Sequence, residues 1–178
     1  VGMRSLKSNT TSYNTAVGYH ALEENTTGAS NTAVGANALD DCTTGQLNVA
    51  IGRNALTALT TGEKNVSVGY NAGANFTDSE DNVSIGQQAS EANTTGDRNI
   101  AVGTRALDNN TVSDNVAVGH EALEANTTGS ENVAVGTRAM EENTTASYNT
   151  AIGFKALRAS TTATKNTAVG NDALLQTT

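Results

Sequence analysis

The chain contains no proline and no tryptophan, and only one of its 178 residues is cysteine. Without proline, every backbone N–H remains a possible donor, which suits strands that pair along both edges. A single cysteine leaves no internal disulfide framework. We interpret Cys42 as drift at a repeat position that usually holds asparagine.

Large apolar residues are also scarce. Aromatic residues make up 3% of the chain, and Leu, Ile, Val and Phe together number 31. Such a composition is typical of disordered chains. However, the apolar residues recur at a fixed interval, and a strict period lets a thin chain build a continuous core by stacking identical rows.

Long hydrophobic runs and basic clusters are both missing. No apolar run approaches the roughly 20 residues that a spanning helix needs, so we expect no membrane insertion. The net charge is −8 and the pI is about 4.6. Because nucleic-acid binding depends on a basic stripe, we expect no nucleic-acid partner.

What the chain does have is a repeat of 17 residues, with one step of 16. We number the positions of each copy from its leading asparagine, as in N-(T/V/I)-(A/S)-(V/I)-G-x-x-(A/S)-L-x-x-N-T-T-G-x-x. A partial copy, 1–13, precedes the first full one. The leading asparagines are Asn14, Asn31, Asn48, Asn65, Asn82, Asn99, Asn115, Asn132, Asn149 and Asn166.

Glycine occupies position 5 of every copy, including Gly2 of the partial one. Glycine at a fixed position marks a backbone that needs a positive φ or that approaches another backbone closely. We therefore predict turn glycines at Gly18, Gly35, Gly52, Gly69, Gly86, Gly103, Gly119, Gly136, Gly153 and Gly170.

Two positions carry the large apolar residues, and we expect each to form a stacked structural row. Position 4 supplies Val17, Val34, Ile51, Val68, Ile85, Val102, Val118, Val135, Ile152 and Val169. Position 9 supplies Leu22, Leu39, Leu56, Leu107, Leu123, Met140, Leu157 and Leu174. Asparagines at position 1 are expected to bond to the asparagines above and below them.

Each copy is predicted to hold two short strands, N-T-A-V and x-A-L-x, joined by turns at glycine and at N-T-T-G. The fold class is thus all-β: a parallel β-solenoid of eleven coils of about 17 residues, forming one domain over 1–178. Because the chain opens within a copy, we expect it to be an excerpt of a longer fibre.

Two irregular copies stand out. The copy from Asn99 is one residue short near 112–114, in the expected second turn. The copy from Asn65 has Gly73 in place of leucine and Phe76 in place of the second asparagine, which predicts a local bulge or a contact point.

Catalytic and metal-binding patterns are not evident. The acidic pairs Glu23-Glu24, Asp40-Asp41 and Glu141-Glu142 lie at variable positions, and we interpret them as part of a solvated rim. His20 and His120 occupy different positions, 7 and 6, so they are not expected to form a ligand pair, and both are predicted to be exposed. We expect no catalysis, no cofactor and no metal, and the sequence leaves open only an incidental surface cation at the acidic pairs.

A column of paired threonines at positions 13 and 14 recurs in most copies, for example Thr26-Thr27 and Thr60-Thr61. Such a column suits turns and strand edges. Flat, regular threonine arrays are also the means by which some solenoids bind ice, so a surface-binding role stays open as the alternative function.

The repeated N-T-A-V-G…A-L…N-T-T-G phrase resembles the head repeats of trimeric autotransporter adhesins and the repeat arrays of bacteriophage tail fibres. The resemblance covers essentially the whole chain. It implies a homotrimer of left-handed parallel β-rolls that acts as a structural or adhesive fibre shaft, extracellular, on a virion or a bacterial surface. The implied partners are two further copies of the chain and a host-surface receptor contacted through flanking regions.

Overall fold

The computed structural model describes residues 1–175, which form ten short strands in one sheet. Every neighbouring pair in the sheet is parallel, and the strands follow one another in chain order. The strands are β1 (Thr15–Val17), β2 (Thr32–Val34), β3 (Val49–Ile51), β4 (Val66–Val68), β5 (Val83–Ile85), β6 (Ile100–Val102), β7 (Val116–Val118), β8 (Val133–Val135), β9 (Thr150–Ile152) and β10 (Thr167–Val169).

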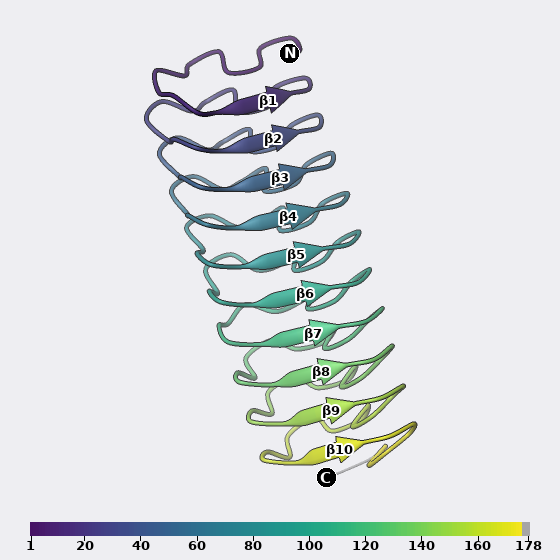
Figure 1. The fold of residues 1–178 in the computed structure, drawn as a ribbon. Helices are drawn as coiled ribbons and strands as arrows, with labels where there is room; N and C mark the ends of the chain where they lie inside the picture. The colour runs from purple at the N-terminus through teal and green to yellow at the C-terminus, as the bar shows by residue number, and fades with distance from the viewer. Residues whose placement is uncertain (176–178) are drawn as a thin grey trace.

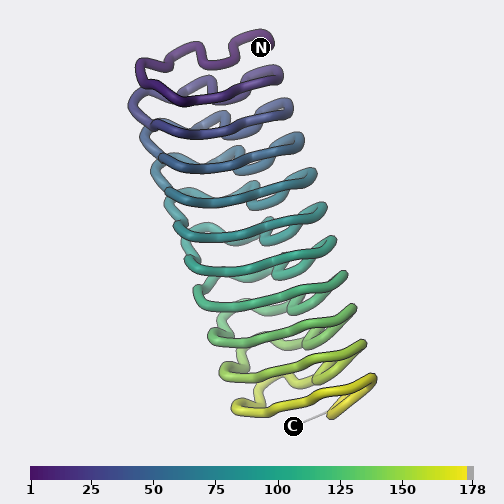
Figure 2. Tube along the Cα trace, in the orientation of Figure 1, coloured from purple at the N-terminus to yellow at the C-terminus, as the bar shows by residue number. Residues whose placement is uncertain are grey.

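The chain is a β-solenoid in which one strand belongs to each coil (Figure 1). The strands run from left to right on the near side and the return segments pass behind them as the chain descends, so the coil is left-handed. Figure 2 shows the same path as a single rod with the N-terminal segment at one end.

The ten strands mark about nine full turns rather than the eleven coils expected from the sequence. The partial copy 1–13 forms turns without a strand. Strand pairing keeps like residues in register, as in the pairs Val66↔Val83 and Val68↔Ile85. The period therefore sets the register, since a shift of one residue would turn every side chain to the other face.

The predicted second strand of each copy is wrong. Residues 19–24 and their equivalents form turns, because positions 7 and 9 adopt the left-handed region, as in His20 (φ 58) and Leu22 (φ 51). The segment still bonds from coil to coil, with Leu22 N donating to Ala38 O at 3.0 Å. Leucine rarely adopts this conformation, and here burial and coil-to-coil bonding hold it there.

Apolar packing lies between the strand and this turn segment. The central residue of each strand points inward, and so do alanine at position 8 and leucine at position 9, with Leu56, Leu107 and Leu123 fully buried. The small residues at positions 3 and 8 leave room for the large side chains of the position-9 row. The coil from Asn48 buries a second leucine, Leu59 at position 12, in addition to Leu56.

Asparagine ladders fill the rest of the interior, as expected for position 1. Asn48 Nδ2 donates to Gly62 O at 2.9 Å, and Asn48 Oδ1 accepts from the backbone N of Asn65 at 2.9 Å. Shorter asparagine ladders lie at position 12, where Asn126 Nδ2 donates to Asn110 Oδ1 at 2.7 Å; Cys42, Leu59 and Phe76 interrupt this column. A buried amide is costly when its polar atoms lack partners. The position-1 ladder supplies such partners from coil to coil, whereas Asn25 Oδ1 and Asn143 Oδ1 at position 12 have none among the described residues.

The position-5 glycines lie where successive backbones come closest. Gly119 has a φ of +141, and a Cβ placed on it would lie 2.5 Å from Gly136 O. An alanine there would be strained in its φ and would also displace the neighbouring coil.

The copy from Asn65 does not form the bulge that its sequence suggested, since β4 pairs in register with β3 and β5. The alternative, a contact point, stays a prediction. Gly73 and Phe76 are both buried, and a Cβ on Gly73 would lie 3.3 Å from the Phe76 ring. The phenylalanine therefore fills the space that leucine occupies elsewhere. The predicted deletion in the copy from Asn99 does fall in the second turn, where Asn110 Nδ2 donates to Val112 O at 2.6 Å.

Candidate functional site

The outer face of the sheet is the first surface of interest. Positions 2 and 4 flank the inward-pointing residue of every strand and therefore stand on the outside. Ile85 is 39% exposed and Ile152 is 42% exposed. The position-4 row is thus stacked as expected, but it lies outside the coil rather than in its core.

The position-9 row behaves differently along the rod. Its members from Leu22 to Leu157 are fully buried, whereas Leu174, in the last coil, is 48% exposed. We call the two outer columns, positions 2 and 4 of β1–β10, the outer apolar face. Its residues are valine, isoleucine and, at position 2 of four strands, threonine.

The threonines of positions 13 and 14 form a ridge along the turns. Thr27, Thr61 and Thr128 are exposed. At position 13 the hydroxyl is used within the protein, since Thr60 Oγ1 donates to Thr77 O at 2.9 Å. The ridge is regular and solvent-facing, but half of its hydroxyl protons already serve the contact between coils.

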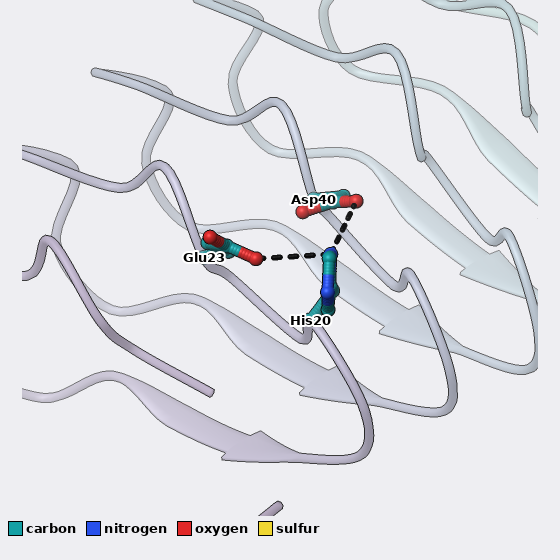
Figure 3. Close-up of side chains that lie close together, drawn as sticks. All are labelled: His20, Glu23 and Asp40. Atoms are coloured by element: carbon teal, nitrogen blue, oxygen red, sulfur yellow. Dashed lines mark ion pairs between the residues drawn. The ribbon is translucent and has the colours of Figure 1, made fainter. Parts of the chain in front are cut away.

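One cluster of titratable side chains departs from the expected solvated rim. Figure 3 shows His20 and Glu23, from the turn after β1, facing Asp40 from the equivalent turn after β2. His20 Nδ1 lies 2.9 Å from Glu23 Oε2 and 3.6 Å from Asp40 Oδ2. Glu23 is 2% exposed and the His20 side chain is largely covered. The predictions that Glu23 lies in the solvated rim and that His20 is exposed are therefore wrong.

The two carboxylate oxygens of Glu23 differ in their partners. Arg4 and Lys7 both reach Glu23 Oε1, at 2.5 and 3.4 Å. Oε2 of Glu23 has no hydrogen-bond donor among the described residues. Burial raises the pKa of the Asp40 carboxyl above its ordinary value, and the neighbouring Asp41 and Glu23 act in the same direction against the opposing effect of His20.

A second acidic group lies further along the same turns. Glu121, Glu124 and Glu141 approach one another, and each is bonded by an arginine: Arg138 Nε to Glu121 Oε2 at 2.7 Å, Arg158 Nε to Glu141 Oε2 at 2.6 Å, and Arg105 to Glu124. Burial tends to raise the pKa of Glu121, but the Arg138 hydrogen bond and the nearby positive charges leave it below its ordinary value. This group is an ion-pair ladder. His120, beside it, is exposed as predicted.

Several other residues can now be placed. Cys42 is buried in the interior column of position 12, and burial raises the pKa of its thiol to about 11. Glu24, Asp41 and Glu142 are exposed, so the second member of each acidic pair does belong to the solvated rim. No ligand-sized pocket occurs within 1–175, and none of these residues forms a helix long and apolar enough to cross a membrane.

Fold and surfaces together define the class: a parallel β-solenoid repeat protein with an uncovered apolar sheet face. No family model, no curated protein and no solved structure matches the chain.

Sequence reasoning missed the His20–Glu23–Asp40 cluster for an identifiable reason. His20 and His120 do not share a position, so no histidine pair was expected. The left-handed turn instead brings positions 7 and 10 together, which places a histidine beside carboxylates. The signal was present as spacing, since His20 and Glu23 are three residues apart and Asp40 follows Glu23 by one repeat of 17.

Proposed function

We propose that the chain is a structural, adhesive shaft segment of an extracellular fibre, either a bacteriophage tail fibre or a bacterial surface adhesin, and that it works as a homotrimer. The observation that carries the proposal is the outer apolar face. The resemblance of the N-T-A-V-G…A-L…N-T-T-G repeat to adhesin head repeats and tail-fibre arrays supports the same role. The shaft has no catalytic function and holds a receptor-binding region, supplied by flanking sequence, away from a particle or cell.

The size of the outer apolar face supports an interface. Ten strands spaced about 4.8 Å apart extend about 43 Å, and three residues at about 3.3 Å each span about 10 Å. The resulting footprint of about 430 Å² lies within the range of the largest apolar patches on monomers, about 300–600 Å², which often mark interaction sites. Exposed Tyr19, Tyr70 and Phe154 at position 6 extend it at one edge.

Three copies suit this face for geometric reasons. Each rod has one apolar face that runs its whole length, and a threefold axis parallel to the rods lets every face be covered by the other two. The acidic net charge is spread over the remaining sides, where it stays in water. In this arrangement no edge of the sheet is used for association, because the coils pair along the rod.

The test is native mass spectrometry at micromolar concentration. The chain of 18.1 kDa should give a species of about three chain masses. A double variant, Ile85→Lys with Val118→Lys, places charges on the outer apolar face and should give single chains with an unchanged circular dichroism spectrum. Thr61→Lys, on the threonine ridge, is the matched control and should remain trimeric. A native chain that is monomeric would contradict the proposal.

A second candidate, binding to ice or to another crystal surface, is favoured by the regular exposure of the threonine ridge. Its test is thermal hysteresis of the purified chain, which the native protein would show and a Thr61→Lys, Thr128→Lys variant would lose. Native chain without thermal hysteresis would remove this candidate and leave the fibre role.

A further inference from the structure

The cluster of His20, Glu23 and Asp40 brings three possible metal-donor atoms together from two adjacent coils. Glu23 is almost fully buried, and its Oε2 has no hydrogen-bond donor although it faces the imidazole. Asp40 has no lysine or arginine partner among the described residues. A proton on Nδ1 can bond to one carboxylate oxygen at a time, whereas a metal ion can accept all three donor atoms together.

The spacing of the donor atoms fits a small transition-metal ion. Ligand atoms about 2.0–2.1 Å from a tetrahedral ion lie about 3.3 Å from one another. The distances from His20 Nδ1, 2.9 Å to Glu23 Oε2 and 3.6 Å to Asp40 Oδ2, bracket that value. One donor atom from each of the three residues lies within 4.8 Å of the other two, so the two carboxylates would close in on the ion as it binds.

Arg4 and Lys7 hold the other side of the glutamate. Both contact Oε1 and neither is paired with Oε2, so they orient the carboxylate with Oε2 toward His20. Outer-shell hydrogen bonds of this kind fix the orientation of ligating side chains in metal sites. The acidic group at Glu121, Glu124 and Glu141 differs, because an arginine bonds each of its three carboxylates. In the His20 cluster, Asp40 has no arginine or lysine partner and Glu23 Oε2 has no hydrogen-bond partner among the described residues.

We propose that His20 Nδ1, Glu23 Oε2 and Asp40 Oδ2 bind one divalent transition-metal ion of the Zn²⁺ type, with water in the remaining position. Imidazole nitrogen and carboxylate oxygen are suitable ligands for such an ion. The ligands come from adjacent coils, so the bound ion links the turns that follow β1 and β2. This site is separate from the outer apolar face and does not depend on the fibre role.

Isothermal titration calorimetry of the EDTA-treated full chain with ZnCl₂ tests the proposal, together with visible absorption after Co²⁺ addition. We expect one equivalent of Zn²⁺ to bind and the melting temperature to rise with Zn²⁺ concentration. His20→Asn should weaken binding by at least about tenfold. Asparagine is chosen because Asn37, Asn54 and Asn71 occupy the same position with the same left-handed φ in the next three coils.

Asp40→Asn is the second variant and should weaken binding similarly, with folding of both variants checked by circular dichroism without metal. His120→Asn is the matched control, and it should bind Zn²⁺ like the native chain. The absence of a binding heat and of Co²⁺ absorption bands would overturn the proposal. So would Zn²⁺ affinity that is unchanged in His20→Asn and Asp40→Asn, or that falls equally in His120→Asn.

Discussion

At the scale of single residues, the direction in which a side chain points decides its contribution to stability. Leu123 and Val118 are both large, apolar and at recurring positions of the repeat, yet Leu123 is fully buried and Val118 lies on the outer apolar face. A fully buried leucine stabilises the fold more than a half-exposed valine does, because the stabilising free energy is roughly proportional to the apolar area removed from water.

We predict that Leu123→Ala destabilises the chain by about 2–5 kcal/mol, since it leaves a cavity in the core. Val118→Ala should cost less than about 1 kcal/mol within a single chain. Denaturant midpoints of the two variants, measured at a concentration where the chains are dissociated, compare them directly. Equal midpoints would mean that the assignment of inner and outer rows is wrong.

Gly73 and Phe76 offer a second test at this scale, because one residue compensates for the other. A Cβ on Gly73 would lie 3.0 Å from Leu56 Cδ2 and 3.3 Å from the Phe76 ring, so Gly73→Leu alone overpacks the core. Phe76→Asn alone leaves a cavity. The double variant restores the leucine and asparagine found together at Leu123 and Asn126.

We predict a favourable coupling of about 0.5–3 kcal/mol in this double-mutant cycle, the range for residues that share one space. Urea unfolding of the native chain, both single variants and the double variant measures it. If the changes in unfolding free energy of the two single variants simply add, Gly73 and Phe76 do not share one packing space.

At the scale of elements, the coil rather than the strand is the unit of structure. Each strand has three residues, and its partners are one repeat away on either side. Repeats of this kind contact only their neighbours, so stability is approximately a sum of unit and interface terms.

Removal of one whole unit, 132–148, should therefore leave a folded, shorter rod, because Asn149 then stacks on Asn115 as Asn132 does now. Removal of half a unit, such as 132–139, should unfold the neighbouring coils, because it places outward residues over inward ones. Circular dichroism and thermal melting of the two deletions, compared side by side, check this expectation. Similar melting temperatures for both would contradict the register argument.

At the scale of the whole molecule, the apolar core is divided in two. One cluster extends from Ala16 to Phe76 and the other from Ala89 to Ala168. Between them, Gly73 and Ser90 replace the leucine of position 9, and the buried hydroxyls of Ser67, Ser84 and Ser90 have no hydrogen-bond partner within the described residues. The apolar core is therefore interrupted at this junction.

We predict that the two halves exchange their amide hydrogens as separate cooperative blocks, with the break between β4 and β5. In native-state hydrogen exchange at increasing denaturant, the amides of one cooperative block converge on a common opening free energy. We expect two such values, one for each half of the rod. A single merged value for all slow amides from β1 to β10 would show that the rod opens as one unit.

The sequence by itself determined the solenoid, the register and the ladders. Its period returns asparagine, a β-branched residue and usually leucine to the same positions of successive coils, and parallel stacking follows because only that arrangement superposes them. The same periodicity explains why long apolar runs are absent, because each coil adds only a few apolar side chains to the core. It also explains the interior asparagines, because neighbouring coils supply their hydrogen bonds.

Only the tertiary structure decided which row is inside and where the charges meet. Alternation along T-A-V leaves two faces, and the small alanine, not the valine, turned out to point inward because the leucine of position 9 needs that space. The left-handed φ values of positions 7 and 9 converted an expected strand into a turn, which brought His20, Glu23 and Asp40 together. Spacing along the chain does not specify these outcomes, since they depend on how neighbouring coils fill one shared interior.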